Sequence, residues 1–154
     1  MDENLARWVF ISIAKYFEPV VSGMGVPYFV EGAMERTEAL MQASHIELRV
    51  TGPDVKPLPG SHDVRVSINL LCTSLMDAAG TDAWTIVQWT GVIQSAMLDP
   101  IPVYRYGTGA DDDETLVGCL RVDQNRVNIY HFGQLEKDSR VRQSEVDASF
   151  LMNI

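Results

Sequence analysis

Three histidines and two cysteines are the residues of this sequence best suited to metal binding or nucleophilic chemistry. His45, His62 and His131 are dispersed along the chain, outside any HExxH motif and without a cysteine at ligand spacing. Cys72 and Cys119 lie in apolar, strand-like runs, where a free cysteine packs as a small hydrophobic side chain. The sequence therefore predicts no zinc or redox site.

Motifs for hydrolysis and nucleotide binding are missing as well. There is no Gly-x-Ser-x-Gly elbow, and the segment 107–109 lacks the third glycine and the Lys-Ser/Thr pair of a phosphate loop. An enzyme would need a site assembled from dispersed histidines and aspartates, which a sequence does not display. We expect no catalytic activity and no cofactor.

The densest group of carboxylates is the run Asp111, Asp112, Asp113 and Glu114. Several carboxylate oxygens can bind a hard cation, but an EF-hand alternates its ligands and closes with a glutamate many residues later. This run leads directly into a predicted strand, so we interpret it as a solvated charge run and expect no metal site.

A small basic group, Lys137, Arg140 and Arg142, precedes the last predicted strand. Such residues commonly form a solvated turn. They are also suited to meet the acidic run of an adjacent copy, because opposite charges steer association and set orientation. Arg140 and Arg142 are therefore candidate subunit contacts.

The composition indicates one folded, acidic domain over residues 1–154. With 46% hydrophobic and 21% charged residues, the chain can enclose a core. The 12 Lys and Arg against 21 Asp and Glu give a net charge of −9, which opposes binding of nucleic acid across the surface. The same charge is compatible with a protein that mimics DNA, or with a protein whose surface lets DNA slide past without binding. The acidic N-terminus predicts no signal peptide and a cytoplasmic start, and the longest uncharged run is shorter than the ~18 residues of a membrane span.

The pattern of apolar residues predicts an α+β fold, with a mostly antiparallel sheet of about five strands and two main helices packed on it. The first helix, capped by Asp2 or Asn4, is expected to end before Pro19. The remaining expectations follow the chain in order: an irregular segment 20–30, a weak helix 33–43, a half-buried strand 45–51, a loop 54–61, a strand 64–73 that closes a hairpin, a loop 99–110, a second hairpin from strands 116–122 and 127–135, and a last strand 143–154.

The central helix, from Thr81 or Asp82 to Leu98, is unusual because it has no charged residue after Asp82. Its apolar residues surround most of the helical circumference, so it requires burial on more than one side. The sheet covers one side. A neighbouring subunit covers the other in one hypothesis, with Trp84, Trp89, Ile93 and Met97 as contacts, and the first helix covers it in the alternative.

The layout as a whole resembles the tail terminator and neck (head-tail joining) proteins of tailed bacteriophages. The resemblance rests on the opening helix DENLARWVF, the hairpin of ELRVTGP and VRVSINLLCTSL, the central helix AWTIVQWTGVIQSAML and the closing strand VRQSEVDASFLMNI. It implies a virion protein, assembled in the host cytoplasm as a ring, commonly a hexamer, on the last tail-tube ring. Such a ring ends tube polymerisation and joins the tail to the head-side connector or neck protein.

Two loop regions are candidates for axial contacts or for lining the lumen of such a ring, where DNA is met only in transit. They contain Asp54 and Lys56 in one loop and the acidic run 111–114 in the other. Other neck, tail-tube or baseplate components remain alternatives. A monomeric acidic inhibitor that mimics DNA is an alternative from a different class.

Overall fold

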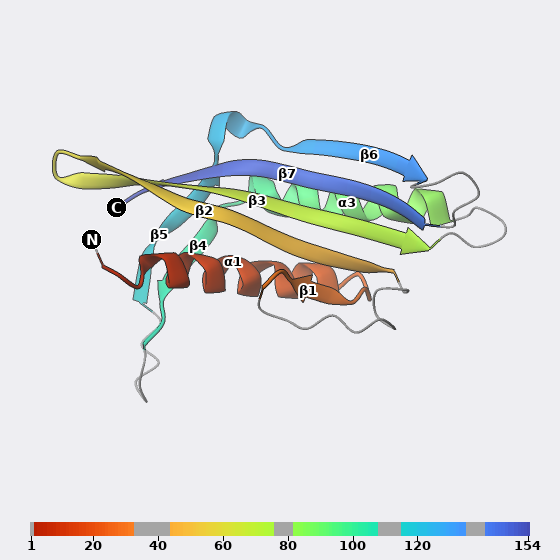
Figure 1. Ribbon diagram of the computed structural model, residues 1–154, viewed down its shortest axis with the longest axis horizontal. Coiled ribbons are helices and arrows are strands. Elements are labelled where there is room, and N and C mark those ends of the chain that lie inside the picture. Colours follow the sequence, from red (N-terminus) through yellow and green to blue (C-terminus); the bar gives the residue numbers. More distant parts are fainter. Residues whose placement is uncertain (1, 33–43, 76–81, 108–114, 135–140) are drawn as a thin grey trace.

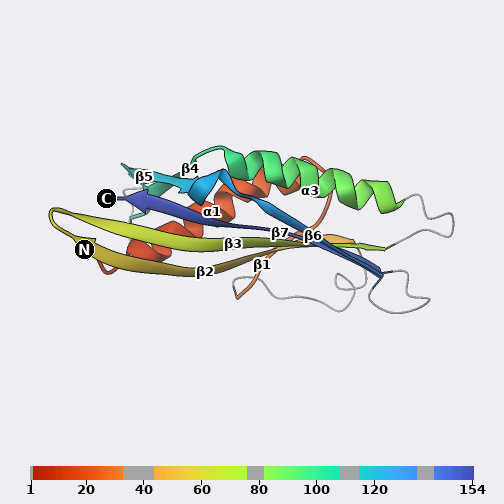
Figure 2. The ribbon, with the colours of Figure 1, turned by 90° about the horizontal axis from the view of Figure 1, so that it is seen from above.

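The computed structural model describes residues 2–32, 44–75, 82–107, 115–134 and 141–154. Two helices pack against one long, curled sheet, which confirms the α+β class (Figures 1 and 2). The strand order is β1-β2-β3-β7-β5-β4, and β6 also pairs with β7. The elements are α1 (Leu5–Ser22), β1 (Tyr28–Val30), β2 (His45–Leu58), β3 (Ser61–Leu75), α3 (Asp82–Leu98), β4 (Ile101–Arg105), β5 (Thr115–Val122), the 3₁₀ turn η1 (Asp123–Asn125), β6 (Asn128–Gln134) and β7 (Val141–Asn153).

The sheet differs from the expected one in strand number and in strand direction. It has seven strands instead of about five, and it is mixed, because β1 runs parallel to β2 while β2–β3, β3–β7, β4–β5, β5–β7 and β6–β7 are antiparallel. Strand β1 lies in the segment predicted to be irregular, and its three residues are too few to show a periodicity. The predicted helix 33–43 lies outside the described residues.

Helix α1 buries one stripe of side chains and continues beyond its predicted end. The carboxylate of Asp2 accepts a hydrogen bond from the backbone N–H of Asn4 at 2.9 Å, just before the first turn. Pro19 is exposed and lies inside the last turn, and its carbonyl accepts the N–H of Gly23 at 2.9 Å. The prediction that the helix ends before Pro19 was wrong. The buried stripe consists of Leu5, Trp8, Val9, Ser12, Ile13, Phe17 and Val21.

The β2–β3 hairpin is confirmed, but its expected loop is largely strand. Strand β2 continues to Leu58 after a register shift between Thr51 and Asp54, so Asp54 and Lys56 lie in an exposed stretch of strand. The turn is confined to the residues around Gly60, which has a φ of 76°. Prolines at the unpaired edge of a sheet do not break the ladder, which is why the Pro-rich segment could continue as strand.

Strands β5 and β6 do not form the hairpin predicted for them. Both pair with β7, β5 at Arg121 and Val122 and β6 from Asn128 onward, so they follow one another along a single edge of β7. Turn η1 separates them, with positive φ at Gln124 and Asn125. Such a turn displaces the chain sideways without reversing it.

The core lies between the helices and one face of β2, β3 and β7. Its fully buried members include Phe17, Ile46, Leu48, Ile68, Leu70, Ile93, Met97, Ile101, Leu120 and Phe150. Strand β4, inside the predicted loop 99–110, contributes Ile101 and Val103 to this core, and the N–H of Tyr104 donates to the hydroxyl of buried Ser12 at 2.9 Å. The hydroxyl of Tyr16 donates to the carbonyl of Ala96 at 2.7 Å and thereby joins α1 to α3.

Candidate assembly surface

Helix α3 has two faces without charge, and only one of them is covered by the rest of the chain. Its buried side packs on β3 and β7 through Ile86, Trp89, Thr90, Ile93 and Met97. Its exposed side is a continuous stripe at helical spacing, formed by Trp84, Val87, Gln88, Gly91, Val92, Ser95 and Leu98. We call these seven residues the α3 stripe. Trp84 is 79% exposed, which is unusual for a side chain whose burial is so favourable.

The structure divides the four apolar residues that were candidate subunit contacts. Trp84 is on the surface, but Trp89, Ile93 and Met97 are at most 8% exposed and belong to the chain's own core. We correct the expectation for these three residues. In a helix whose one charged residue is its first, Asp82, the hydrophobic periodicity does not indicate which side faces the sheet. The alternative, in which α1 covers the second side of α3, holds for neither Trp84 nor Val87, since both remain exposed.

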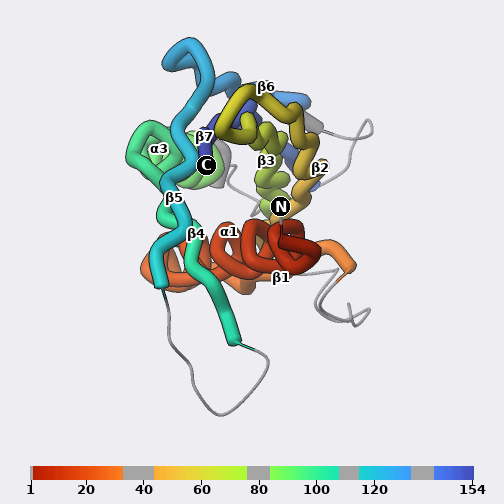
Figure 3. Tube along the Cα trace, turned by 90° about the vertical axis from the view of Figure 1, so that its left-hand side faces the viewer, coloured from red at the N-terminus to blue at the C-terminus, as the bar shows by residue number. Residues whose placement is uncertain are grey.

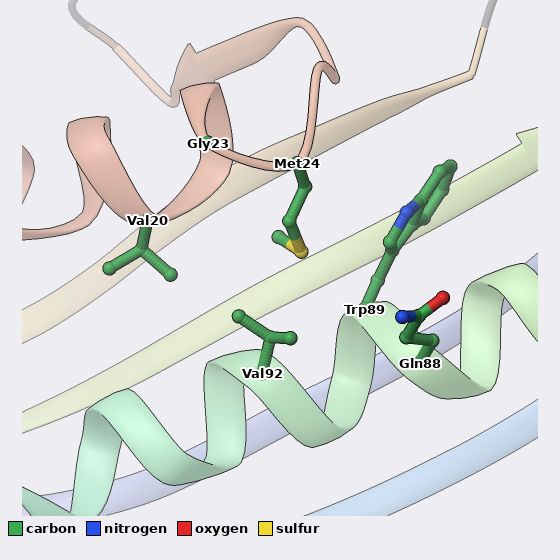
Figure 4. Close-up of a pocket in the computed structure, with 6 residues that line it drawn as sticks. All are labelled: Val20, Gly23, Met24, Gln88, Trp89 and Val92. Carbon is green, nitrogen blue, oxygen red and sulfur yellow. The ribbon is translucent and has the colours of Figure 1, made fainter.

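A pocket of about 450 Å³ lies between the C-terminal end of α1 and helix α3. Figure 4 shows Val20 and Met24 directed toward α3, with Val92 and Trp89 on the opposite side. Val92 belongs to the α3 stripe as well as to this pocket. A partner that covered the stripe would therefore also reach the pocket.

Gly91 lies in the middle of the α3 stripe and has no role in packing within the chain. A Cβ atom placed there meets no heavy atom within 4 Å. Glycine inside a helix destabilises it by roughly 0.5–1 kcal/mol relative to alanine. Gly91 therefore lowers the stability of the subunit, and no contact within the described part of the chain explains its presence. Gly91 leaves a shallow notch in the stripe, which permits close approach of another chain.

Strand β6 carries a second exposed apolar surface. Tyr130 is 48% exposed and Phe132 is 52% exposed. The segment 127–134 contains no Lys, Arg, Asp or Glu, and the Nδ1 atom of its one histidine, His131, lies 2.7 Å from the hydroxyl of Ser144. Among the described strands, β6 pairs only with β7, so its other edge is open.

The remaining predicted contact residues give less information. Arg142 is half-buried at the start of β7, where it pairs in register with Ser74 and Gln134. Arg140 and the run 111–114 lie outside the described residues. Asp54 and Lys56 are exposed on the β2–β3 hairpin.

The sheet face opposite the helices contains a charged cluster that the sequence pattern did not reveal. Glu47 is 1% exposed, although the alternation of residues 45–51 had placed it on the solvent side. Its carboxylate lies 3.2 Å from Nε of Arg49, which is also 3.7 Å from the carboxylate of Glu31. Burial of a charge requires such a partner. Partial burial, followed by the negative charge of Asp147, raises the pKa of the nearby Glu145.

The described residues contain no cluster suited to a metal ion, and one of their two cysteines is deeply buried. Within these residues, no three His, Cys, Asp or Glu side chains are grouped so that they could hold a metal ion. Burial raises the pKa of the Cys72 thiol to about 12, so this cysteine stays protonated and unreactive at neutral pH. Neither helix in the described part of the chain is both long and apolar enough to cross a membrane.

Comparison of the chain with protein-family models found no match, and no curated protein is significantly similar to it. The exposed surfaces of the chain are therefore the features that bear on its function.

Proposed function

We propose that this protein is a structural subunit of a bacteriophage tail, which assembles as a ring that caps the tail tube and joins it to the head-side connector. The observation that carries the proposal is the α3 stripe, which is exposed and uncharged along its whole length. The α+β architecture and the negative charge are compatible with the resemblance to tail terminators. The hexameric state, the tail-tube and neck partners and the place in the virion are parts of the same proposal.

A second copy of the chain is the partner that best fits the α3 stripe. Two molecules with a net charge of −9 repel each other over most of their surfaces. Electrostatic repulsion between them is weakest where they approach through an uncharged stripe. Burial of apolar area contributes about 25 cal/mol per Å², and tryptophan is prominent among the residues that dominate interface energies. Trp84, Val87, Val92 and Leu98 would supply that area.

The acidic surface agrees with passage of DNA through such a ring. Lys and Arg are outnumbered by Asp and Glu, so the ring would not retain the phosphate backbone. Ending the growth of a tube requires no catalytic group.

Negative-stain microscopy of the purified chain at micromolar concentration tests the proposal. We expect short closed rings of one size. Long stacks of rings would instead indicate a tail-tube subunit. A uniform population of single 17.2 kDa particles would refute the assembly proposal and favour a monomeric DNA mimic.

A further inference from the structure

A closed ring requires two different surfaces on each subunit, because the contact between neighbours is head to tail. The α3 stripe supplies one of these surfaces. Among the described residues, seven large hydrophobic side chains are exposed, namely Trp84, Val87, Val92 and Leu98 on α3, Leu116 on β5, and Tyr130 and Phe132 on β6. Strand β6 is therefore the one other element on which exposed large apolar side chains gather.

We infer that each junction of the ring is formed by the α3 stripe of one copy and strand β6 of the next. This inference rests on the proposed self-assembly and specifies its geometry. Neither the α3 stripe nor strand β6 itself contains a charged residue, and the nearest charge to Tyr130 across the strands is its register partner Glu145 on β7, which would border the contact.

The open edge of β6 differs from the open edge of β2. Beyond its pairing with β1, the free edge of β2 carries Pro53 and Pro57, a register shift after Thr51, and the charged residues Asp54 and Lys56. Proline, bulges and charge are the features by which proteins protect an edge strand from other chains. Strand β6 has neither proline nor a formal charge, although a register shift lies between His131 and Gly133. Of these two edges, that of β6 is therefore the one without such protection.

The shape of the α3 stripe suits aromatic side chains. The position of Gly91 is open, and the 450 Å³ pocket beside Val92 is lined by Val20, Met24 and Trp89 together with the polar side chain of Gln88. Tyr130 or Phe132 of the next copy would fill this space. Helix α3 and strand β6 are neighbouring elements (Figure 3), and the side-chain amide of Gln94 on α3 donates to the carbonyl of Val127, just before β6, at 3.5 Å.

A complementation experiment tests this geometry. The Trp84→Glu variant has a damaged α3 stripe and an intact β6, whereas Phe132→Glu has the reverse. We expect each variant alone to be monomeric by light scattering. An equimolar mixture should form a 1:1 dimer of twice the 17.2 kDa chain mass and nothing larger, because only one of its two possible junctions is intact.

Leu116→Glu is the matched control. Leu116 is 55% exposed but lies on β5, outside both surfaces, so the variant should assemble like the wild type. Circular dichroism and thermal unfolding of all three variants check that each is folded.

The outcomes separate the inference from the proposed function. Assembly that is lost in Trp84→Glu but retained in Phe132→Glu would overturn the role of β6 and leave self-assembly standing. A dimer formed by either variant alone would show that its intact surface pairs with its own kind. Two monomeric variants that fail to form a dimer when mixed would show that the two surfaces do not meet in one junction, and either result overturns the inference. A monomeric wild type would refute self-assembly itself.

Discussion

The Gly91→Ala substitution should stabilise the isolated subunit while it weakens the assembly. The new methyl group meets no atom within 4 Å, so it introduces no steric cost in the folded chain. Alanine in a helix interior is more favourable than glycine by about 0.8–1.0 kcal/mol. For a chain of this size that corresponds to a rise in Tm of about 2–4 °C. In the assembly, the same methyl group fills the notch against which a neighbour would pack.

Two measurements are needed, because the two effects have opposite signs. The stability of the subunit is measured by urea unfolding of Gly91→Ala in the Trp84→Glu background, which is expected to be monomeric. The assembly is measured by sedimentation of Gly91→Ala in the otherwise wild-type chain, where we expect a larger monomer fraction at each concentration.

Gly118→Ala provides the contrast. A Cβ at Gly118 would lie 3.3 Å from both the Cγ2 of Ile154 and the Sδ of Met152, so the substitution should give no gain in stability. If Gly91→Ala failed to raise the free energy of unfolding, Gly91 would not be an unobstructed helical residue. If the variant assembled as well as the wild type, the notch would not be part of the junction.

Three further predictions concern the subunit alone. Ser12→Ala removes the acceptor of the Tyr104 N–H and should lower the free energy of unfolding by about 1–3 kcal/mol, measured by urea denaturation; an unchanged midpoint would mean that this bond is absent. In the native protein at pH 8, iodoacetamide should modify the half-buried Cys119 and leave Cys72, whose pKa is raised to about 12, unmodified until the chain unfolds. Because burial raises the pKa of Glu145 above 4.5, its contribution favours the folded state below pH 4.5 and is lost as the pH rises through the folded-state pKa. Glu145→Gln should therefore increase stability at neutral pH and reduce this pH dependence, and a loss of stability at neutral pH would contradict the assignment.

Long periodic segments were predictable from the sequence. The apolar alternation of β3 and β7 and the bounds of α3 agree with the structure, because burial of one face imposes a strict period on the side chains. The short strands β1 and β4 were missed. Strand β1 has only three residues and lies next to proline and glycine, and strand β4 (Ile101–Arg105) has a proline at its second position. Both segments therefore resemble a loop by composition. Their strand structure depends on neighbours that are distant in sequence.

The assembly surface was predicted only in part. The absence of charge on α3 correctly indicated two apolar sides, but three of its four proposed contacts are core residues. The choice of side depends on how the helix packs on β3 and β7, which no local pattern encodes. Exposure of Tyr130 and Phe132 was missed for a similar reason, since a strand pattern does not show which strand ends at an open edge.

The most direct test of the central claim is the mass of the wild-type chain in solution, compared with that of Trp84→Glu by size-exclusion chromatography with light scattering. Both proteins are measured at the same micromolar concentration. We predict one closed oligomer for the wild type and a monomer of 17.2 kDa for the variant. Equal masses for the two proteins would contradict the claim that the exposed side of α3 holds the assembly together.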